Sequence, residues 1–238
     1  MAFLQPPASQ QPAFNIPGAV AVLLIVLIVA HVARMLVPAP LADDILVRYA
    51  FNPALYSPGF LTLHHLDPGP LWQRAVPFVS YMFLHGDLTH LAVNCVWLLA
   101  FGPVVARRFG GARFLSFFFL CGIGAAVAQL VCSWGTFEPV VGASGAISGL
   151  MAAGIRMVPL PGARFETEPL LPLASSRVLL FTGIWAVVNV VAGMTGFTGV
   201  GTEVRLIAWQ AHLGGYFCGL LLSGPFDRIS RRDSITVA

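Results

Sequence analysis

The sequence contains no lysine and has few charges of either sign. Its 13 basic residues are all arginine, and charged residues make up only 10% of the 238, against about 25% in an average soluble domain. Hydrophobic residues make up 57%. A water-soluble protein of this size needs more charged residues than this to cover its surface. We therefore expect that most of the surface of this protein is in contact with lipid. The arginines are dispersed, which argues against a nucleic-acid surface.

Cysteine is also scarce, and its spacing is not that of a metal site. The four cysteines lie in or beside apolar stretches and form no CxxC pair. We expect them to be buried as small apolar side chains. They are Cys95, Cys121, Cys132 and Cys218.

Long apolar runs are plentiful, and six of them approach the roughly 20 residues that a helix needs to cross a bilayer. Alternating strands of about ten residues, typical of outer-membrane barrels, do not match this pattern. We therefore predict an all-α membrane protein, a bundle of six transmembrane helices. The predicted spans cover residues 18–37, 88–106, 114–134, 140–158, 178–197 and 206–226.

The arginines predict how this bundle is oriented. Cytoplasmic loops of membrane proteins carry an excess of Lys and Arg. Nine of the 13 arginines lie at or after the ends of the second, fourth and sixth spans. We therefore expect a multi-pass protein of a bacterial cell (inner) membrane with both termini in the cytoplasm. Residues 1–16 would be a disordered tail, 17–226 the six-span domain and 227–238 a cytoplasmic tail.

Residues 38–87 form a long loop on the outer side, between the first and second spans. The loop mixes aromatic and aliphatic residues with proline and glycine. We expect short helices lying in the membrane interface, with an ordinary solvated connector as the alternative. Asp87 is predicted to cap the helix that follows it.

Polar side chains on the even-numbered spans share one depth. His90, Asn94, Ser144 and His212 all fall within roughly 3–9 Å of the outer ends of their spans, at 1.5 Å per residue. Placing a polar side chain inside a bilayer costs free energy, so polar residues at such positions indicate a functional site. Each one alone could bond to its own backbone or bridge two helices, but their common depth favours a shared site. Isolated polar residues on the other spans are expected to make interhelical hydrogen bonds. These are His31, Gln129 and Asn189.

Ser144 lies at a glycine-rich helix start, next to Gly142 and Gly145. Glycine permits a tight turn, and the free N–H groups of a helix start stabilise an anion. A serine hydroxyl at this position therefore has an oxyanion site beside it.

Small residues predict that the fourth and sixth spans approach closely. Gly145 and Gly149 share a face, and Gly215 and Gly219 repeat the spacing one turn beyond His212. Such an approach would allow a hydrogen bond between the serine and histidine side chains.

Three motifs contain these residues: HGDLTHLAVN with His85, His90 and Asn94, GASG with Ser144, and AHLGG with His212. In this order, and on the second, fourth and sixth spans, they resemble the motifs of the rhomboid family of intramembrane serine proteases. The resemblance extends over most of the chain.

The resemblance implies a role for each residue. Ser144 would be the nucleophile and His212 the general base, a dyad without a carboxylate. His90, Asn94 and the Ser144 backbone N–H would form the oxyanion hole. The substrates would be single-span membrane proteins, cut near the outer membrane surface, and neither a metal nor a cofactor would be needed.

His85, Gly142 and Gly145 would support this site, but two other positions depart from the family. Many members carry an aromatic residue, which stacks against the base, where this chain has Ser148. Trp209 and Tyr216 are the candidates to replace that contact. The Trp-Arg pair of the family's first outer loop matches only loosely, because Gln73 separates Trp72 from Arg74.

Three alternatives remain at this stage. A catalytically inactive rhomboid-like protein would bind membrane clients without cutting them, although such relatives generally lack the serine or the histidine. A transporter or channel would place its polar residues near the midplane. A zinc protease using His85, His90 and the His64-His65 pair would lack an HExxH motif.

Overall fold

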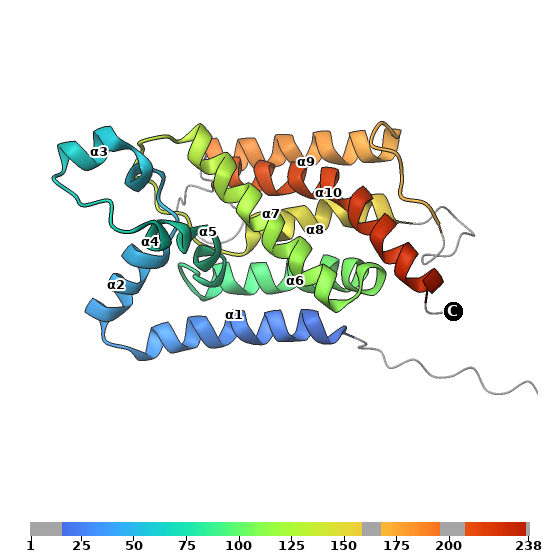
Figure 1. Ribbon diagram of the computed structural model, residues 1–238, viewed down its shortest axis with the longest axis horizontal. Coiled ribbons are helices and arrows are strands. Elements are labelled where there is room, and N and C mark those ends of the chain that lie inside the picture. The colour runs from blue at the N-terminus through green and yellow to red at the C-terminus, as the bar shows by residue number, and fades with distance from the viewer. Residues whose placement is uncertain (1–15, 159–167, 196–207, 237–238) are drawn as a thin grey trace, which may run out of the picture.

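The computed structural model describes residues 16–158, 168–195 and 208–236. The regular secondary structure of this part of the chain is helical apart from one isolated bridge between Phe51 and Val140, so the predicted all-α class is confirmed for it. Its longest helices form a bundle (Figure 1). They are α1 (Gly18–Leu36), α6 (Leu88–Phe109), α7 (Gly111–Cys132), α8 (Ser144–Met157), α9 (Ser176–Thr195) and α10 (Trp209–Thr236).

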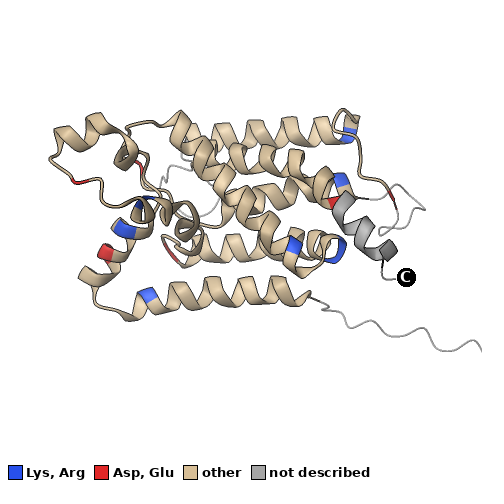
Figure 2. Cartoon of the chain, in the orientation of Figure 1, with Lys and Arg blue, Asp and Glu red and all other residues tan. Residues whose placement is uncertain are grey.

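Four of these helices are long and apolar enough to cross a membrane: α1, α6, α7 and α9, with 19 to 22 residues each. Their outward-facing side chains include large exposed hydrophobic residues such as Ile25 and Val187. Exposing these side chains to water would cost free energy, whereas exposing them to lipid would not. Charged residues gather toward the two ends of the bundle, and its middle carries few of them (Figure 2). The chain is a membrane protein with several apolar helices.

The helix boundaries differ from the predicted spans at several places. The fourth span was expected from residue 140, but α8 begins only at Ser144 and has 14 residues. Val140 instead pairs with Phe51 through two backbone hydrogen bonds of 3.0 and 2.7 Å, and Gly142 has a φ of +113°. Neither conformation belongs to an α-helix. The prediction was wrong by four residues, which makes Ser144 the first residue of its helix.

The predicted ends of the chain are only partly described. Residues 1–15 of the expected N-terminal tail lie outside the described residues, as do residues 206 and 207, where the sixth span was expected to begin. Residues 196 and 197, at the expected end of the fifth span, are also outside them. The C-terminal residues 227–236 continue α10 as helix.

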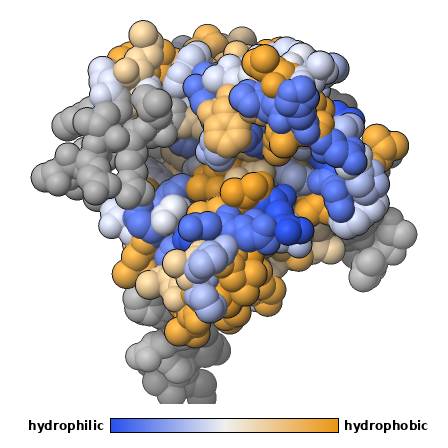
Figure 3. Space-filling view, turned by 90° about the vertical axis from the view of Figure 1, so that its left-hand side faces the viewer, coloured by the Kyte–Doolittle hydropathy of each residue, from blue (hydrophilic) through white to orange (hydrophobic). Residues whose placement is uncertain are grey.

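Short helices occupy the segment between α1 and α6, and they lie together at one end of the bundle (Figure 1). Proline at the first helical position and the caps Asn52 and Ser57 start several of them. At that end hydrophilic residues crowd the middle of the surface, with hydrophobic residues beside them (Figure 3). The elements are α2 (Ala39–Tyr49), η1 (Pro53–Tyr56), α3 (Pro58–Leu63), α4 (Leu71–Ala75), α5 (Pro77–Ser80) and η2 (Tyr81–Phe83).

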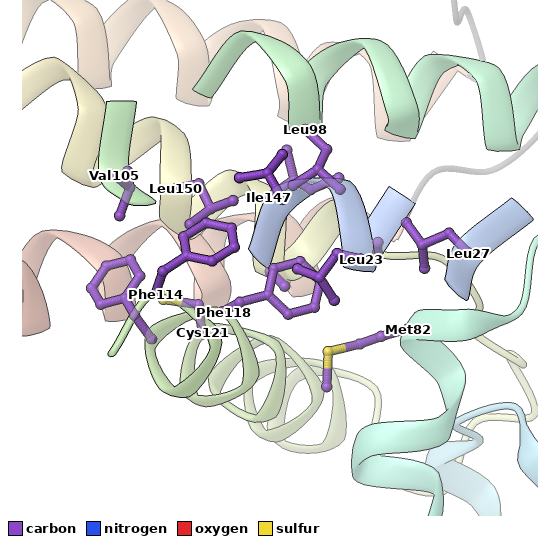
Figure 4. Packing of buried hydrophobic residues seen from close by; sticks show 14 of the residues in the cluster. Leu23, Leu27, Met82, Leu98, Val105, Phe114, Phe118, Cys121, Ile147 and Leu150 are labelled. Atoms are coloured by element: carbon purple, nitrogen blue, oxygen red, sulfur yellow. The ribbon is translucent and has the colours of Figure 1, made fainter. Parts of the chain in front are cut away.

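A cluster of buried side chains joins α1, α6, α7 and α8 (Figure 4). Phe114 and Phe118 of α7 are fully buried, as are Leu98 of α6 and Leu150 of α8. Inside a bilayer, lipid tails are as apolar as these side chains, so close packing rather than exclusion of water holds the helices together.

Glycines bring α8 and α10 into backbone contact. A Cβ atom added at Gly215 would collide with the carbonyl oxygen of Gly145, and one added at Gly219 would collide with that of Gly149. The close approach predicted from the spacing of these four glycines is confirmed. It places the start of α8 directly against the first turns of α10.

Candidate active site

Ser144 begins α8 directly after a turn at Gly142 that is stabilised by hydrogen bonds. Gly142 precedes it in the left-handed region, at φ +113°, where residues with a Cβ are strained. The Gly142 N–H donates to the carbonyl of Tyr81 (2.9 Å), and the buried Tyr81 hydroxyl donates to the carbonyl of Gly122 on α7 (2.8 Å). Tyr81 is thus a supporting residue that the sequence analysis missed.

Ser144 and His212 come together across the contact between α8 and α10. Ser144 Oγ lies 2.8 Å from His212 Nε2, which is hydrogen-bond distance. Both side chains are only partly buried. The Ser144 N–H belongs to the first helical turn, whose N–H groups have no carbonyl partner within the helix. This arrangement can move a proton from the hydroxyl to the imidazole, beside a backbone N–H that has no partner within its own helix.

The side chains of His90 and Ser144 both lie close to Gly142. A Cβ at Gly142 would be 2.7 Å from His90 Nε2 and 3.8 Å from Ser144 Oγ, so both side chains border the space that this glycine leaves open. Asp87 accepts the His90 N–H at 2.8 Å, which confirms the predicted helix cap. His90 is therefore fixed within the first turn of α6.

Asn94 is one turn deeper in α6 and does not bond to Ser144. Its amide nitrogen donates to the carbonyl of His90 (2.9 Å), and its side chain is buried at 2% exposure. Its carboxamide oxygen has no hydrogen-bond partner among the described residues. The structure therefore brings Ser144, His212 and His90 to one place, whereas the Asn94 amide bonds to the backbone of its own helix.

His85 is fully buried just before α6, with its ring between those of His31 and His90. The ring centroids are 6.4 Å from His31 and 5.2 Å from His90. Burial lowers the pKa of His85 to about 3, and His90 and His31 add to the effect, so the ring is neutral. Its backbone carbonyl accepts a hydrogen bond from Arg34 of α1 (2.8 Å).

Asn189 contacts the far side of the His212 ring. Its Oδ1 lies 2.8 Å from His212 Nδ1, so the interhelical hydrogen bond predicted for Asn189 is confirmed, although its partner was not foreseen. The same prediction was wrong for Gln129, which donates to Ser133 at the end of its own helix (3.0 Å). The only sequence signal for Asn189 was a lone polar residue on an apolar span.

The two departures from the family pattern also have defined surroundings. The Ser148 hydroxyl donates to the carbonyl of Ser144 (2.8 Å). The Tyr216 ring stacks on Trp185 with 4.2 Å between centroids. Arg74 lies over the ring of Tyr56, 5.6 Å from its centroid, and its carbonyl accepts the Tyr56 hydroxyl (2.7 Å).

The histidines considered for a zinc site are spread over different elements. His64 caps the end of α3, where its ring packs on Phe60 at 4.2 Å between centroids. In the described ranges no three His, Cys, Asp or Glu side chains are grouped as a ligand set.

Comparison with known proteins places the chain in a family. The family model of the Rhomboid domain matches residues 69–227, more than half of the chain. The chain belongs to the rhomboid family. The match runs from just before α4 into α10, so it includes the elements that carry Ser144, His90 and His212.

Curated rhomboid relatives match parts of the chain. RHOMBOID-like protein 5 of Arabidopsis thaliana is 31% identical over 46% of this chain and 38% of its own length. Rhomboid protease GluP of Bacillus subtilis is 38% identical over 36% of this chain and 15% of its own length. Rhomboid protease AarA of Providencia stuartii is 32% identical over 37% of this chain and 34% of its own length. The matches thus span well under half of each of these relatives.

Proposed function

We propose that this rhomboid protein is an intramembrane serine endopeptidase that cuts single-span membrane proteins near the outer membrane surface. The observation that carries the proposal is the 2.8 Å distance between Ser144 Oγ and His212 Nε2. Two relatives are named as rhomboid proteases, which supports the same activity. Ser144 is the nucleophile and His212 the general base.

The reaction follows from the positions of these groups. Ser144 Oγ attacks the carbonyl carbon of the peptide bond, and its proton passes to His212 Nε2. His90 and the Ser144 N–H stabilise the oxyanion, and the Asn94 side chain bonds to the carbonyl of His90. The C–N bond then breaks, and the leaving amine takes the proton from His212. Water, deprotonated by the same imidazole, cleaves the acyl ester and restores Ser144.

We also propose that all six long helices lie in the bilayer, with both termini in the cytoplasm and Ser144 below the outer surface. The 14 residues of α8 extend only about 21 Å at 1.5 Å per residue, less than the roughly 30 Å of a hydrocarbon core. A helix of this length that reaches the cytoplasmic side begins inside the outer leaflet. A substrate helix must unwind locally to present its carbonyl there, since its peptide groups are internally bonded.

The test compares the wild type with Ser144→Ala and His212→Ala in proteoliposomes that contain a single-span substrate. We expect both variants to lose at least about a thousandfold in cleavage rate, because each removes one partner of the proton transfer. A fluorophosphonate probe should label Ser144 in the wild type and fail to label His212→Ala.

Thermal unfolding in detergent serves as the control for folding of both variants. Cleavage by folded Ser144→Ala would refute the assignment of the nucleophile. A wild type that binds the substrate but neither cuts it nor reacts with the probe would support the inactive, client-binding alternative.

A further inference from the structure

The imidazole of His212 has a hydrogen-bond partner on each nitrogen. Ser144 Oγ lies 2.8 Å from Nε2, and Asn189 Oδ1 lies 2.8 Å from Nδ1. The three residues come from three different helices, α8, α10 and α9. The ring is therefore held from both sides, and its protonation pattern depends on what each partner can donate or accept.

The carboxamide of Asn189 has a fixed direction. Its Nδ2 donates to the carbonyl of Trp185, one turn earlier in α9 (2.9 Å). This bond assigns the amide nitrogen to the helix side and the oxygen to the imidazole side. A carboxamide oxygen only accepts hydrogen bonds, so Nδ1 of His212 carries the hydrogen. The lone pair is then on Nε2, which faces the serine.

We propose that Asn189 is a positioning residue for the general base, and that it fixes both the tautomer and the orientation of His212. The inference rests on the proposed function, since it concerns the same proton transfer. Asn189 thereby takes the place of the third member of a serine protease triad, with a neutral oxygen where many such enzymes use a carboxylate.

The surroundings of His212 leave this task to Asn189. The hydroxyl of Ser148 is engaged with the carbonyl of Ser144 (2.8 Å). Tyr216 stacks on Trp185, and its hydroxyl shares a hydrogen bond with Thr182 (2.9 Å). Trp209 packs against Gly193. The side chains that the sequence offered as replacements for a stacked aromatic therefore have other partners.

The Thr182–Tyr216 hydrogen bond provides a matched control. It also joins α9 to α10, and Thr182 lies two turns before Asn189 on the same helix, but the hydrogen bonds of the His212 ring go to Asn189 and Ser144 instead. Replacing Thr182 with valine removes one α9–α10 hydrogen bond of similar length and leaves the imidazole untouched. Replacing Asn189 with leucine, which has nearly the same shape, removes the α9–α10 hydrogen bond to His212.

The experiment measures kcat and KM for a single-span substrate in proteoliposomes, together with the rate of fluorophosphonate labelling of Ser144. For Asn189→Leu we expect kcat and the labelling rate to fall about 10- to 150-fold, because a hydrogen bond to the imidazolium of the transition state is lost. KM should stay within a factor of two or so of the wild type. Thr182→Val should match the wild type in all three values, and Asn189→Asp, which keeps an acceptor, should recover most of the loss.

Thermal unfolding in detergent shows which variants are folded. The inference is overturned if folded Asn189→Leu keeps the wild-type kcat, or if Thr182→Val loses as much activity as Asn189→Leu. It is also overturned if folded Asn189→Asp is as slow as Asn189→Leu. If Asn189→Asp does not fold, Asn189→Leu and Thr182→Val decide the question between them. A wild type that neither cuts nor reacts with the probe would refute the proposed function instead.

Discussion

At the scale of single residues, the backbone of Gly142 shapes the candidate site as much as the side chains do. Its φ of +113° turns the chain into α8, and the missing Cβ leaves the space between His90 and Ser144 open. That space is where the proposed oxyanion would form. Gly142, which has no side chain, therefore controls access to the side chains of His90 and Ser144.

We predict that Gly142→Ala abolishes labelling of Ser144 by a fluorophosphonate probe. The added Cβ would lie 2.7 Å from His90 Nε2, and the left-handed backbone costs about 1–2 kcal/mol in strain. Gly110→Ala is the matched control, because Gly110 also has a positive φ, +79°, but a Cβ there meets nothing within 4 Å. Equal labelling of both variants would contradict this account.

Sequence patterns predicted these residues unevenly. The polar residues near the outer ends of spans pointed to Ser144, His90 and His212, because charge-free helices make each polar group conspicuous. Asn189 was predicted to bond across helices, but a lone polar residue does not identify its partner. Tyr81 gave no signal, since its role is to brace a backbone turn through long-range contacts.

At the scale of helices, the contact between α8 and α10 determines the Ser144–His212 distance. Gly145 and Gly149 face Gly215 and Gly219 with no room for a side chain. The spacing of these glycines predicted the contact because it is a local pattern. The start of α8 was mispredicted because hydropathy along the chain does not reveal that Val140 pairs with Phe51, far away in the sequence.

We predict that Gly215→Leu inactivates the protein by separating these two helices. Overpacking of this kind lowers stability by about 1–3 kcal/mol or more. The hydrogen bond between Ser144 and His212 would break when the leucine pushes α10 away from α8. Gly183→Leu on α9 is the control, since nothing lies within 4 Å of a Cβ at that position. Cleavage rate and the midpoint of thermal unfolding in detergent are the measurements. Retained cleavage by folded Gly215→Leu would refute the argument.

At the scale of the whole molecule, the two ends of the bundle differ. The short helices α2 to α5 gather at one end, and the beginning of α1 and the end of α10 lie at the other (Figure 1). The arginine count predicts that the latter end faces the cytoplasm. Among the described residues, four helices are long and apolar enough to cross a membrane. Whether α8 and α10 also lie in the membrane requires a direct test.

We predict that a green fluorescent protein fused after residue 238 is fluorescent in bacterial cells and that alkaline phosphatase fused there is inactive, because the proposed orientation places the C-terminus in the cytoplasm. Alkaline phosphatase fused after Gly135, which lies between α7 and α8, should be active. The fusion after the α7 segment is the internal control for export. Active phosphatase at the C-terminus would contradict an even number of spans.

The glycine contacts leave α8 and α10 no freedom to separate without losing the site. Under the proposed function, a substrate arriving from the lipid would have to displace a more loosely held neighbour, and α9 is one, because only Val178 and Gly193 of its 20 residues are buried. Displacement of α9 would also withdraw Asn189 from His212. The substrate would then enter first, and His212 would become an effective base only after α9 has returned and Asn189 again bonds to its ring. While α9 is displaced, the imidazole would not be held in position for proton transfer.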